Sequence, residues 1–245
     1  MTNGYQNEID FINYLNNKKF EELNIMMQDV IKSIYPNIKS KDIIKASKYG
    51  RYAKTDIVIT VRNKKRGISL KCGYKNSIHV EPITKFKKFL VSNNVDERTI
   101  DMFLRYLYSD GTNNNTGKIR ITNAEYIDEH KSDIKILNET FANLKPKIIK
   151  RFLIETDIKY NVKVDMFIHG KLNDFIWATA EEVKEFLEKE EIISTSVHSG
   201  KIYIQNWDKN IKRNEKYEFC REYIQAKWFS MYDDMIAIIA TRENY

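Results

Sequence analysis

An aspartate and a lysine at the two ends of one predicted β-hairpin are the residues of this sequence best suited to joint chemistry. Asp56 lies near the start of a run rich in Ile and Val, residues 55–61, and Lys71 lies near the end of a second run, residues 67–72. The charged residues 62–66 separate the runs, and this pattern is typical of a β-hairpin. Because the start of one antiparallel strand lies beside the end of its partner, Asp56 and Lys71 should meet at one edge of a sheet. Such a pair is either a simple ion pair or the smallest set of side chains that metal-assisted hydrolysis of a phosphodiester requires.

This hairpin resembles the catalytic hairpin of the PD-(D/E)xK nucleases, and among them that of the type II restriction endonucleases. Asp56 stands where the family has its metal-binding aspartate, and Ser69-Leu70-Lys71 stands where the family has its acid-x-Lys motif. The resemblance covers the N-terminal part of the chain, up to about Leu90, and its motif is short. It implies an α/β (α+β) fold with a restriction-endonuclease-like core, in which helices flank a mixed β-sheet. The implied activity is that of a site-specific endonuclease that hydrolyses double-stranded DNA with Mg²⁺.

Ser69 departs from the family's pattern, because a serine cannot act as the anionic metal ligand expected there. One branch of the restriction enzymes has the same Ser-x-Lys form, and in that branch a glutamate from the following helix supplies the missing charge. Glu81 is the corresponding candidate in this sequence. Glu8 lies in residues 7–34, whose spacing predicts one or two amphipathic helices, and stands where many members place a further acid. The resemblance implies that Glu8 binds a second metal or positions the lysine, whereas the sequence alone makes it equally well a charge that suits the helix dipole.

The chemistry that the resemblance implies uses hard oxygen ligands. Asp56, Glu81 and the backbone carbonyl of Leu70 would hold Mg²⁺, with Mn²⁺ as a substitute. Lys71 would orient or deprotonate the attacking water, and Ser69 would donate a hydrogen bond to the water shell of the metal. Two such sites are needed to cut both strands of a duplex, so a homodimer is expected by symmetry. A restriction enzyme also implies a cognate DNA methyltransferase in the same system.

Two other functions remain open on the same scaffold. The first is a structure-selective nuclease of the repair or junction-resolving type, although a sizeable second module favours sequence recognition instead. The second is a catalytically inactive DNA-binding protein, because Ser69 breaks the usual pair of acids. Glu81 discriminates between the active and inactive forms, since a carboxylate more than about 6 Å from that of Asp56 is too distant to share one ion with it.

The composition indicates a basic chain with an anionic partner. Its 245 residues include 41 Lys and Arg against 34 Asp and Glu, which gives a net charge of +7, and nucleic acid is the commonest polyanion that such a chain binds. The alternative is a Lys-rich chain that is basic without binding nucleic acid. Two cysteines in a chain of this length predict a reducing, cytoplasmic setting. No apolar run approaches the roughly 18 residues of a membrane span, and no zinc-ligand spacing or phosphate-cradling glycine loop is present.

Basic residues precede the hairpin in the segment 41–54, which also contains Tyr49 and Tyr52. Cations interleaved with aromatic residues directly before the catalytic strand could grip the DNA backbone near the scissile phosphate. A solvated basic loop is the alternative. The candidate DNA contacts in this segment are Lys45, Lys48, Arg51 and Lys54.

A helix is expected after the turn that follows Lys71, with its start marked by Ser77 and Pro82. If Pro82 is the first helical residue, Glu81 stands at the helix cap and its carboxylate points back toward Lys71. The alternative role of Glu81 is to complement the helix dipole. Lys85, on the outer side of this helix, is a candidate phosphate contact.

The polar loop TNNNTG is the best candidate for a domain boundary. We expect a nuclease core over residues 1–112 and a C-terminal α+β portion over residues 113–245, which packs on the core and recognises DNA. The alternating pattern over residues 162–169 predicts the first main strand of this second portion. Its candidate contacts to bases and phosphates are Arg221, Gln225 and Lys227. The alternative is that the neighbouring Tyr223, Ile224 and Trp228 are core residues and the charges are solvated.

Overall fold

The structure is a computed structural model that describes residues 4–50, 54–73, 76–155, 161–192, 194–207 and 215–242. Its fold is mixed α/β, as predicted. The chain forms two compact units that alternate along the sequence. The first unit comprises Met1–Lys75, Ile149–Lys189 and Ser230–Tyr245, and the second comprises Asn76–Ile148 and Glu190–Phe229.

These units do not follow the expected division at residue 112. The TNNNTG loop lies inside the second unit, between α4 (Glu97–Tyr108) and α5 (Asn123–Glu129). Polar, Gly-containing segments form surface loops within a unit as readily as they form links between units. Composition therefore locates this loop but does not identify the unit boundary.

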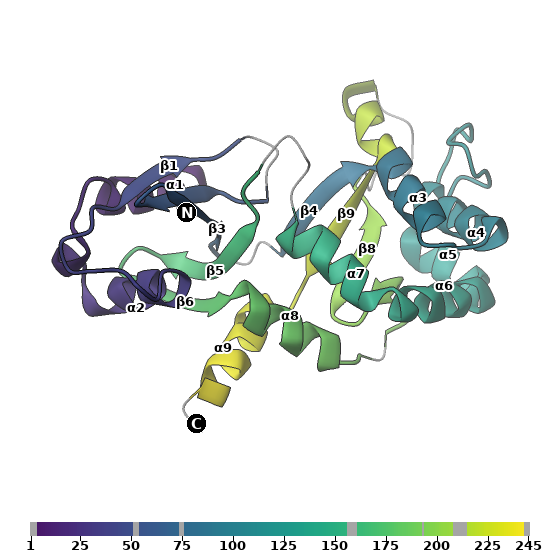
Figure 1. Ribbon diagram of the computed structural model, residues 1–245. Helices are drawn as coiled ribbons and strands as arrows, with labels where there is room; N and C mark the ends of the chain where they lie inside the picture. The colour runs from purple at the N-terminus through teal and green to yellow at the C-terminus, as the bar shows by residue number, and fades with distance from the viewer. Residues whose placement is uncertain are drawn as a thin grey trace. The chain divides into compact units, whose positions relative to one another are not determined.

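The first unit is built on a five-stranded mixed sheet with the order β1-β2-β3-β5-β6 (Figure 1). Its strands are β1 (Lys45–Lys48), β2 (Ile57–Val61), β3 (Lys64–Lys71), β5 (Val164–Lys171) and β6 (Asp174–Thr179). Neighbouring strands are antiparallel except for β3 and β5, which are parallel. The expectation of a mixed sheet is therefore confirmed.

Strands β2 and β3 form the predicted hairpin, in which Ile57 pairs with Ile68. Its turn has two residues, Arg62 and Asn63, whose φ angles are 46° and 66°. Positive φ at both central positions gives a turn whose twist matches that of the paired strands. The turn is shorter than the predicted segment 62–66 because residues 64–66 already pair with β2.

Strand β5 lies directly beside β3, although the two are far apart in the sequence. Their register shifts between Gly67 and Ile68, where the Gly67 N–H donates to Asp165 Oδ2 at 2.9 Å. A Cβ at position 67 would lie 2.1 Å from the Lys163 carbonyl oxygen, so the close approach of backbones here requires glycine. The strand predicted over residues 162–169 thus exists, but it completes the sheet that contains the hairpin and not a separate C-terminal module.

Helices α1 (Gly4–Leu15) and α2 (Ile25–Ile34) pack on one face of this sheet and confirm the helices predicted over residues 7–34. The one-turn helix η1 (Phe20–Glu22) separates them. Phe11 of α1 and Ile31 of α2 belong to one buried cluster with Ile57 and Ile68 of the hairpin. Helix α8 (Ala180–Lys189) contacts β5 and β6, and α9 (Met231–Arg242) contacts β6 (Figure 1).

The second unit is built on a four-stranded antiparallel sheet with the order β4-β9-β8-β7. Its strands are β4 (Ser77–Pro82), β9 (Tyr223–Trp228), β8 (Ile202–Asn206) and β7 (His198–Ser199). Helices α3 (Ile83–Ser92), α4 and α6 (Lys131–Asn143) share an aromatic core, in which the Phe103 ring lies 5.5 Å from that of Phe86 and 5.2 Å from that of Phe141. Helix α7 (Lys145–Ile149) and the π-helix η2 (Lys150–Ile154) lead back to the first unit, and η3 (Glu215–Glu222) precedes β9.

The helix expected around Pro82 begins later than predicted. Residues 77–82 form strand β4, and Pro82 is the N-cap of α3, with φ −57° and ψ 137°. Ile78 and Val80 alternate with His79 and Glu81, which is a strand pattern. Proline tolerates the extended conformation that ends the strand as well as the first turn of a helix, so its presence did not decide between them. Across the described ranges, no helix is both long and apolar enough to cross a membrane.

Candidate active site

The structure brings Asp56 and Lys71 together, as the hairpin predicts. Lys71 Nζ lies 3.5 Å from Asp56 Oδ2, and the two side chains are 21% and 20% exposed. Asp56 immediately precedes β2 and Lys71 is the last residue of β3, so the antiparallel pairing positions both of them. A charge pair that is shielded from most of the solvent, yet still reachable, can act on an anionic substrate more strongly than a pair on the open surface.

Backbone and side-chain donors of β3 orient the Asp56 carboxylate. Its Oδ2 accepts hydrogen bonds from the Leu70 N–H at 2.7 Å and from Ser69 Oγ at 3.3 Å, in addition to the contact with Lys71. The Asp56 N–H donates to the Ile68 carbonyl at 2.9 Å. None of the three contacts on the carboxylate uses Oδ1, so Oδ1 is the oxygen that can accept a further ligand.

Ser69 and Leu70 thus have observed partners that differ from their predicted ones. Ser69 is buried, and its hydroxyl donates to Asp56. The N–H of Leu70 holds the same carboxylate, whereas the predicted role concerned its carbonyl oxygen. Both residues act here as positioning groups for Asp56, and their predicted contacts to a metal or to its waters stay predictions.

His169 joins this site from β5 and was given no role by the sequence. It pairs in register with Lys71, and paired residues of neighbouring strands project from the same face of a sheet. Its Nε2 lies 3.2 Å from the Gly73 carbonyl, which can only accept, so Nε2 carries a proton. Burial lowers the pKa of His169 below its ordinary value, which favours the neutral ring with a basic Nδ1. The Tyr232 ring of α9 lies 5.3 Å from the imidazole.

Glu8 lies on α1 and forms an ion pair with Lys48 of β1, at 2.8 Å. Lys48 Nζ also lies 4.0 Å from the centre of the Tyr5 ring. Glu8, a predicted acid of the site, and Lys48, a predicted DNA contact, are therefore partners in one ion pair. Their predicted roles toward a second metal and toward DNA stay predictions.

Glu81 belongs to the second unit, and its local environment differs from the expected one. It lies in β4 opposite Ile224, not at a helix cap, and is only 4% exposed. His79 Nε2, two residues away on the same face of the strand, lies 3.7 Å from Glu81 Oε2. The cap geometry predicted for Glu81 is therefore wrong, because β4 continues through Pro82, and its role as a metal ligand stays a prediction.

The remaining basic candidates of the N-terminal part and of α3 lie in different settings. Lys45 is exposed at the start of β1, so part of the predicted basic loop is a strand at the edge of the sheet. Lys54 Nζ donates to the Glu155 carbonyl oxygen. Lys85 is half-buried on α3, and Arg51 lies outside the described residues.

The C-terminal candidates divide according to the alternation of β9. Ile224, Ala226 and Trp228 are fully buried, which confirms a core role for Ile224 and Trp228. Gln225 and Lys227 project from the other face and are half-buried, and Gln225 Nε2 donates to Ser77 Oγ at 2.9 Å. Arg221 of η3 is 0% exposed, and its predicted contact to DNA stays a prediction. The sequence does not show whether the aliphatic part and the guanidinium of a single arginine are buried.

The residues present fit a Mg²⁺ site in which waters and substrate phosphate oxygens supply most of the ligands. Within the described residues, no group of three or more His, Cys, Asp or Glu side chains is placed to hold a metal ion. Asp56 nevertheless offers a carboxylate oxygen that none of the described hydrogen bonds occupies. One or two carboxylates, completed by waters and substrate phosphates, are a common way to bind Mg²⁺.

Comparison with known proteins adds no family to this picture. The sequence matches no protein-family model, and the search of curated proteins finds no match.

Proposed function

We propose that this protein is a Mg²⁺-dependent endonuclease that cuts double-stranded DNA at specific sites, in the manner of type II restriction enzymes. One observation carries the proposal: the contact between Asp56 and Lys71 at the open end of the hairpin, with Ser69 and Leu70 orienting the carboxylate. A carboxylate with one oxygen outside the hydrogen bonds of the described residues, beside an ammonium, is suited to a cation and a phosphate together. The basic composition of the chain supports a polyanionic substrate.

The residues of the first unit divide the work of hydrolysis. Asp56 would hold Mg²⁺ through Oδ1, with DNA phosphate oxygens and waters as further ligands. When bound, the ion lowers the pKa of a coordinated water and neutralises charge on the phosphate. The Lys71 ammonium would orient the attacking water and offset the negative charge that develops on the phosphate. The neutral His169 on the adjacent strand would accept a proton at Nδ1.

Replacement of Lys71 tests the proposal. Wild type and Lys71→Ala are incubated with a long duplex of mixed sequence in Mg²⁺, beside an EDTA control, and the products are resolved and end-mapped. We expect discrete fragments from wild type only, with cleavage by Lys71→Ala reduced by at least about 100-fold and DNA affinity largely retained. Lys71→Ala cutting at the wild-type rate would refute the assignment.

The matched control is Lys32→Ala. Lys32 is an exposed lysine in α2 of the same unit, and it contributes the same charge without contacting Asp56. It should cut like wild type. Thermal melting of both variants shows whether a loss of cleavage follows from a loss of folding.

A second candidate is a catalytically inactive DNA-binding protein on the same scaffold. It is favoured by the finding that the described residues hold no group of three acids, histidines or cysteines placed for a metal. Salt-sensitive DNA binding without cleavage would select this candidate. A smear of products in place of fragments would instead indicate a nonspecific or structure-selective nuclease.

Assembly and setting form part of the same proposal. Cutting both strands at one site calls for a homodimer that places two hairpins across the duplex, and sedimentation with and without DNA tests it. A cognate methyltransferase would protect the host DNA, and the expected setting is the cytoplasm, where that DNA lies. Reduced cleavage of DNA methylated by such a partner would support this.

A further inference from the structure

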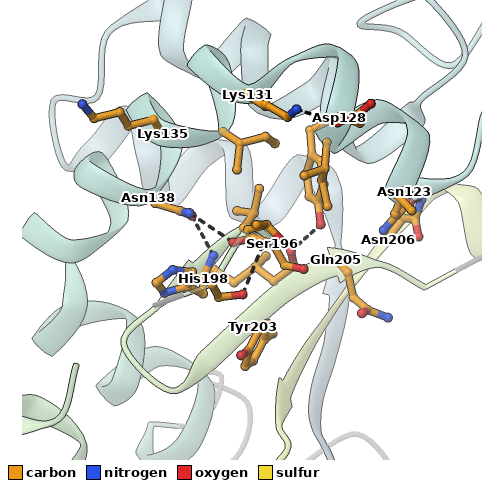
Figure 2. A pocket seen from close by; sticks show the side chains of 18 of the residues that line it. Asn123, Asp128, Lys131, Lys135, Asn138, Ser196, His198, Tyr203, Gln205 and Asn206 are labelled. Carbon is orange, nitrogen blue, oxygen red and sulfur yellow. Dashed lines mark hydrogen bonds and ion pairs between the residues drawn. The ribbon is translucent and has the colours of Figure 1, made fainter. Parts of the chain in front are cut away.

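The second unit contains a pocket of about 1010 Å³ that the proposed catalytic chemistry does not use (Figure 2). Its walls come from α5, α6, the segment before β7, and β8. Apolar side chains such as Ile127, Ile134 and Val197 line it together with several amides. A concave site with an apolar lining and a few convergent polar groups is the usual form of a small-ligand site.

Asn206 is the polar group that points most directly to a ligand. Its side chain is 2% exposed, and its Nδ2 donates to the Leu107 carbonyl at 2.9 Å and lies 3.5 Å from Asn123 Oδ1. These contacts fix the orientation of the amide, and its Oδ1 is left buried with no hydrogen bond within the described part of the chain. A buried amide oxygen in a pocket wall calls for an N–H donor from whatever fills the pocket.

His198 lines the same pocket from β7. Its Nδ1 lies 3.1 Å from the Gly200 carbonyl, and burial lowers the pKa of this histidine, which favours the neutral ring. Gln205 alternates with Asn206 along β8, and its side chain points away from that of Asn206 (Figure 2). The pocket therefore presents a buried acceptor, Asn206 Oδ1, which calls for a ligand that carries a hydrogen-bond donor and not for a bare inorganic anion.

Asn138 serves a different purpose, although it also lines the pocket. Its Nδ2 donates to the Ser196 carbonyl at 3.1 Å, and its Oδ1 accepts from the His198 N–H at 2.9 Å (Figure 2). It thereby ties the segment before β7 to α6. The pocket wall that carries His198 is thus held in place before any ligand binds, which lowers the entropy cost of binding.

Aromatic and cationic side chains complete the lining. Phe229 is 52% exposed, its ring packs edge-on against Tyr203 at 4.8 Å, and Lys227 Nζ lies 5.4 Å from the centre of the same ring. Lys131 and Lys135 lie on α6 with exposed side chains. Lys131 pairs with Asp128, and Lys135 pairs with Glu139. An apolar and aromatic lining, a buried amide oxygen that needs a donor and lysines at the mouth match a planar heterocycle that carries a phosphate.

We propose that this pocket binds one nucleotide, with its base against Asn206 and its phosphate near Lys131 and Lys135. The base presents an N–H donor, from an exocyclic amino or ring imino group, to Asn206 Oδ1. If the protein is the endonuclease proposed above, this nucleotide is one that the DNA substrate extrudes from the stack, which costs unstacking energy and adds recognition. The same chemistry would bind a free mononucleotide.

The first measurement is calorimetric titration of the full chain with dAMP, dCMP, dGMP and dTMP, and with inorganic phosphate alone. We expect saturable binding of at least one mononucleotide and weaker binding of phosphate. Affinity should fall by about ten-fold or more in the double variant Lys131→Ala/Lys135→Ala and in Asn206→Leu. Lys147→Ala, which removes an exposed lysine of the same unit outside the pocket, should bind like wild type.

The double lysine variant keeps the test decisive if Asn206→Leu fails to fold, since both lysines are exposed. The second measurement uses duplexes that carry 2-aminopurine at successive positions of the mapped cleavage site. A rise in fluorescence with wild type, lost in the pocket variants, supports an extruded base. Mononucleotide binding without any rise supports the ligand class but overturns DNA as its source.

Failure of the pocket and failure of the proposed nuclease are separable. If no mononucleotide binds and the pocket variants keep wild-type DNA affinity, the pocket inference is overturned, whether or not wild type cuts DNA. If mononucleotides bind to wild type and equally to Lys71→Ala but no DNA is cut, the nuclease proposal fails and the pocket stands.

Discussion

At the scale of the residue, Asp56 combines a structural and a chemical role in one carboxylate. Its Oδ2 satisfies the Leu70 N–H just beyond the last pair of β2 and β3, while its Oδ1 accepts none of the three contacts. The same bonds that close the end of the hairpin also hold the group in the orientation that a cation would use. Preorganisation of this kind costs nothing at the moment of reaction.

The substitution Asp56→Asn separates the two roles. The amide oxygen can still accept from Leu70, so the loss in stability should be below about 1 kcal/mol, which is the worth of a partly exposed ion pair. Cleavage should nevertheless be lost, because a neutral amide is a poor ligand for Mg²⁺. Asp56→Ala also leaves the Leu70 N–H without its acceptor and should cost about 1–3 kcal/mol more. Urea denaturation and the DNA cleavage assay measure the two effects, and wild-type cleavage by Asp56→Asn would contradict the chemical role.

The sequence was sufficient to predict the contact between Asp56 and Lys71, because both residues belong to one local hairpin. It was not sufficient for His169, whose place beside Lys71 depends on the pairing of two strands that are distant in the sequence. The full burial of Arg221 could not be predicted either, since burial of a charged side chain depends on the packing of η3 and not on its neighbours in the sequence. Local pairings are readable from pattern, whereas non-local pairings and burial are set by the tertiary fold.

At the scale of the element, β3 is the strand on which the candidate site depends. It pairs with β2 on one side and with β5 on the other, and Gly67 allows the backbone near Lys163 to approach closely. The helices over residues 7–34, the hairpin strands and the strand over residues 162–169 were predicted near their true positions because their hydrophobic periodicity is clear. Strand β1 was not, since it lies in the expected basic loop, and neither was β4, where Pro82 favoured a helix start while the alternation of Ile78 and Val80 indicated a strand.

Substitution of Gly67 tests the importance of this approach. A Cβ in Gly67→Ala would lie 2.1 Å from the Lys163 carbonyl oxygen and within 3 Å of Thr55, so one of the strands must shift. We expect a loss of roughly 3 kcal/mol in the free energy of unfolding, in the upper range for overpacking of a tight site. Gly4→Ala is the control, because a Cβ there meets nothing within 4 Å. Equal unfolding midpoints for the two variants would show that the strands tolerate separation.

At the scale of the whole molecule, the chain enters and leaves the second unit twice. Strands β5 and β6 and helices α8 and α9 return to the first unit after the second has begun, so neither unit is a single stretch of sequence. Composition and loop polarity could not reveal this, because the crossings carry no distinctive sequence. The expected cut near residue 112 falls within one unit for the same reason.

A fragment of residues 1–112 should therefore fail to fold. It retains β1, β2 and β3 but lacks β5 and β6, and with them the buried Met166 and Ile168 that complete the core of the first unit. It also holds only part of the second unit. Circular dichroism should show no cooperative thermal transition for the fragment, in contrast to the full chain. A cooperative transition with dispersed amide resonances would mean that the predicted boundary had identified an autonomous domain.

The alternation of the two units also decides how the molecule would respond to tension. Both ends of the described chain, residues 4 and 242, belong to the first unit, and both segments of the second unit lie between segments of the first. A force applied at the two ends is therefore borne by the first unit alone until that unit opens. In an optical trap the contacts that hold α9 to β6 and α8 would break before the unit that carries the pocket bears any load. The order in which the two units are loaded thus follows from the connectivity of the chain.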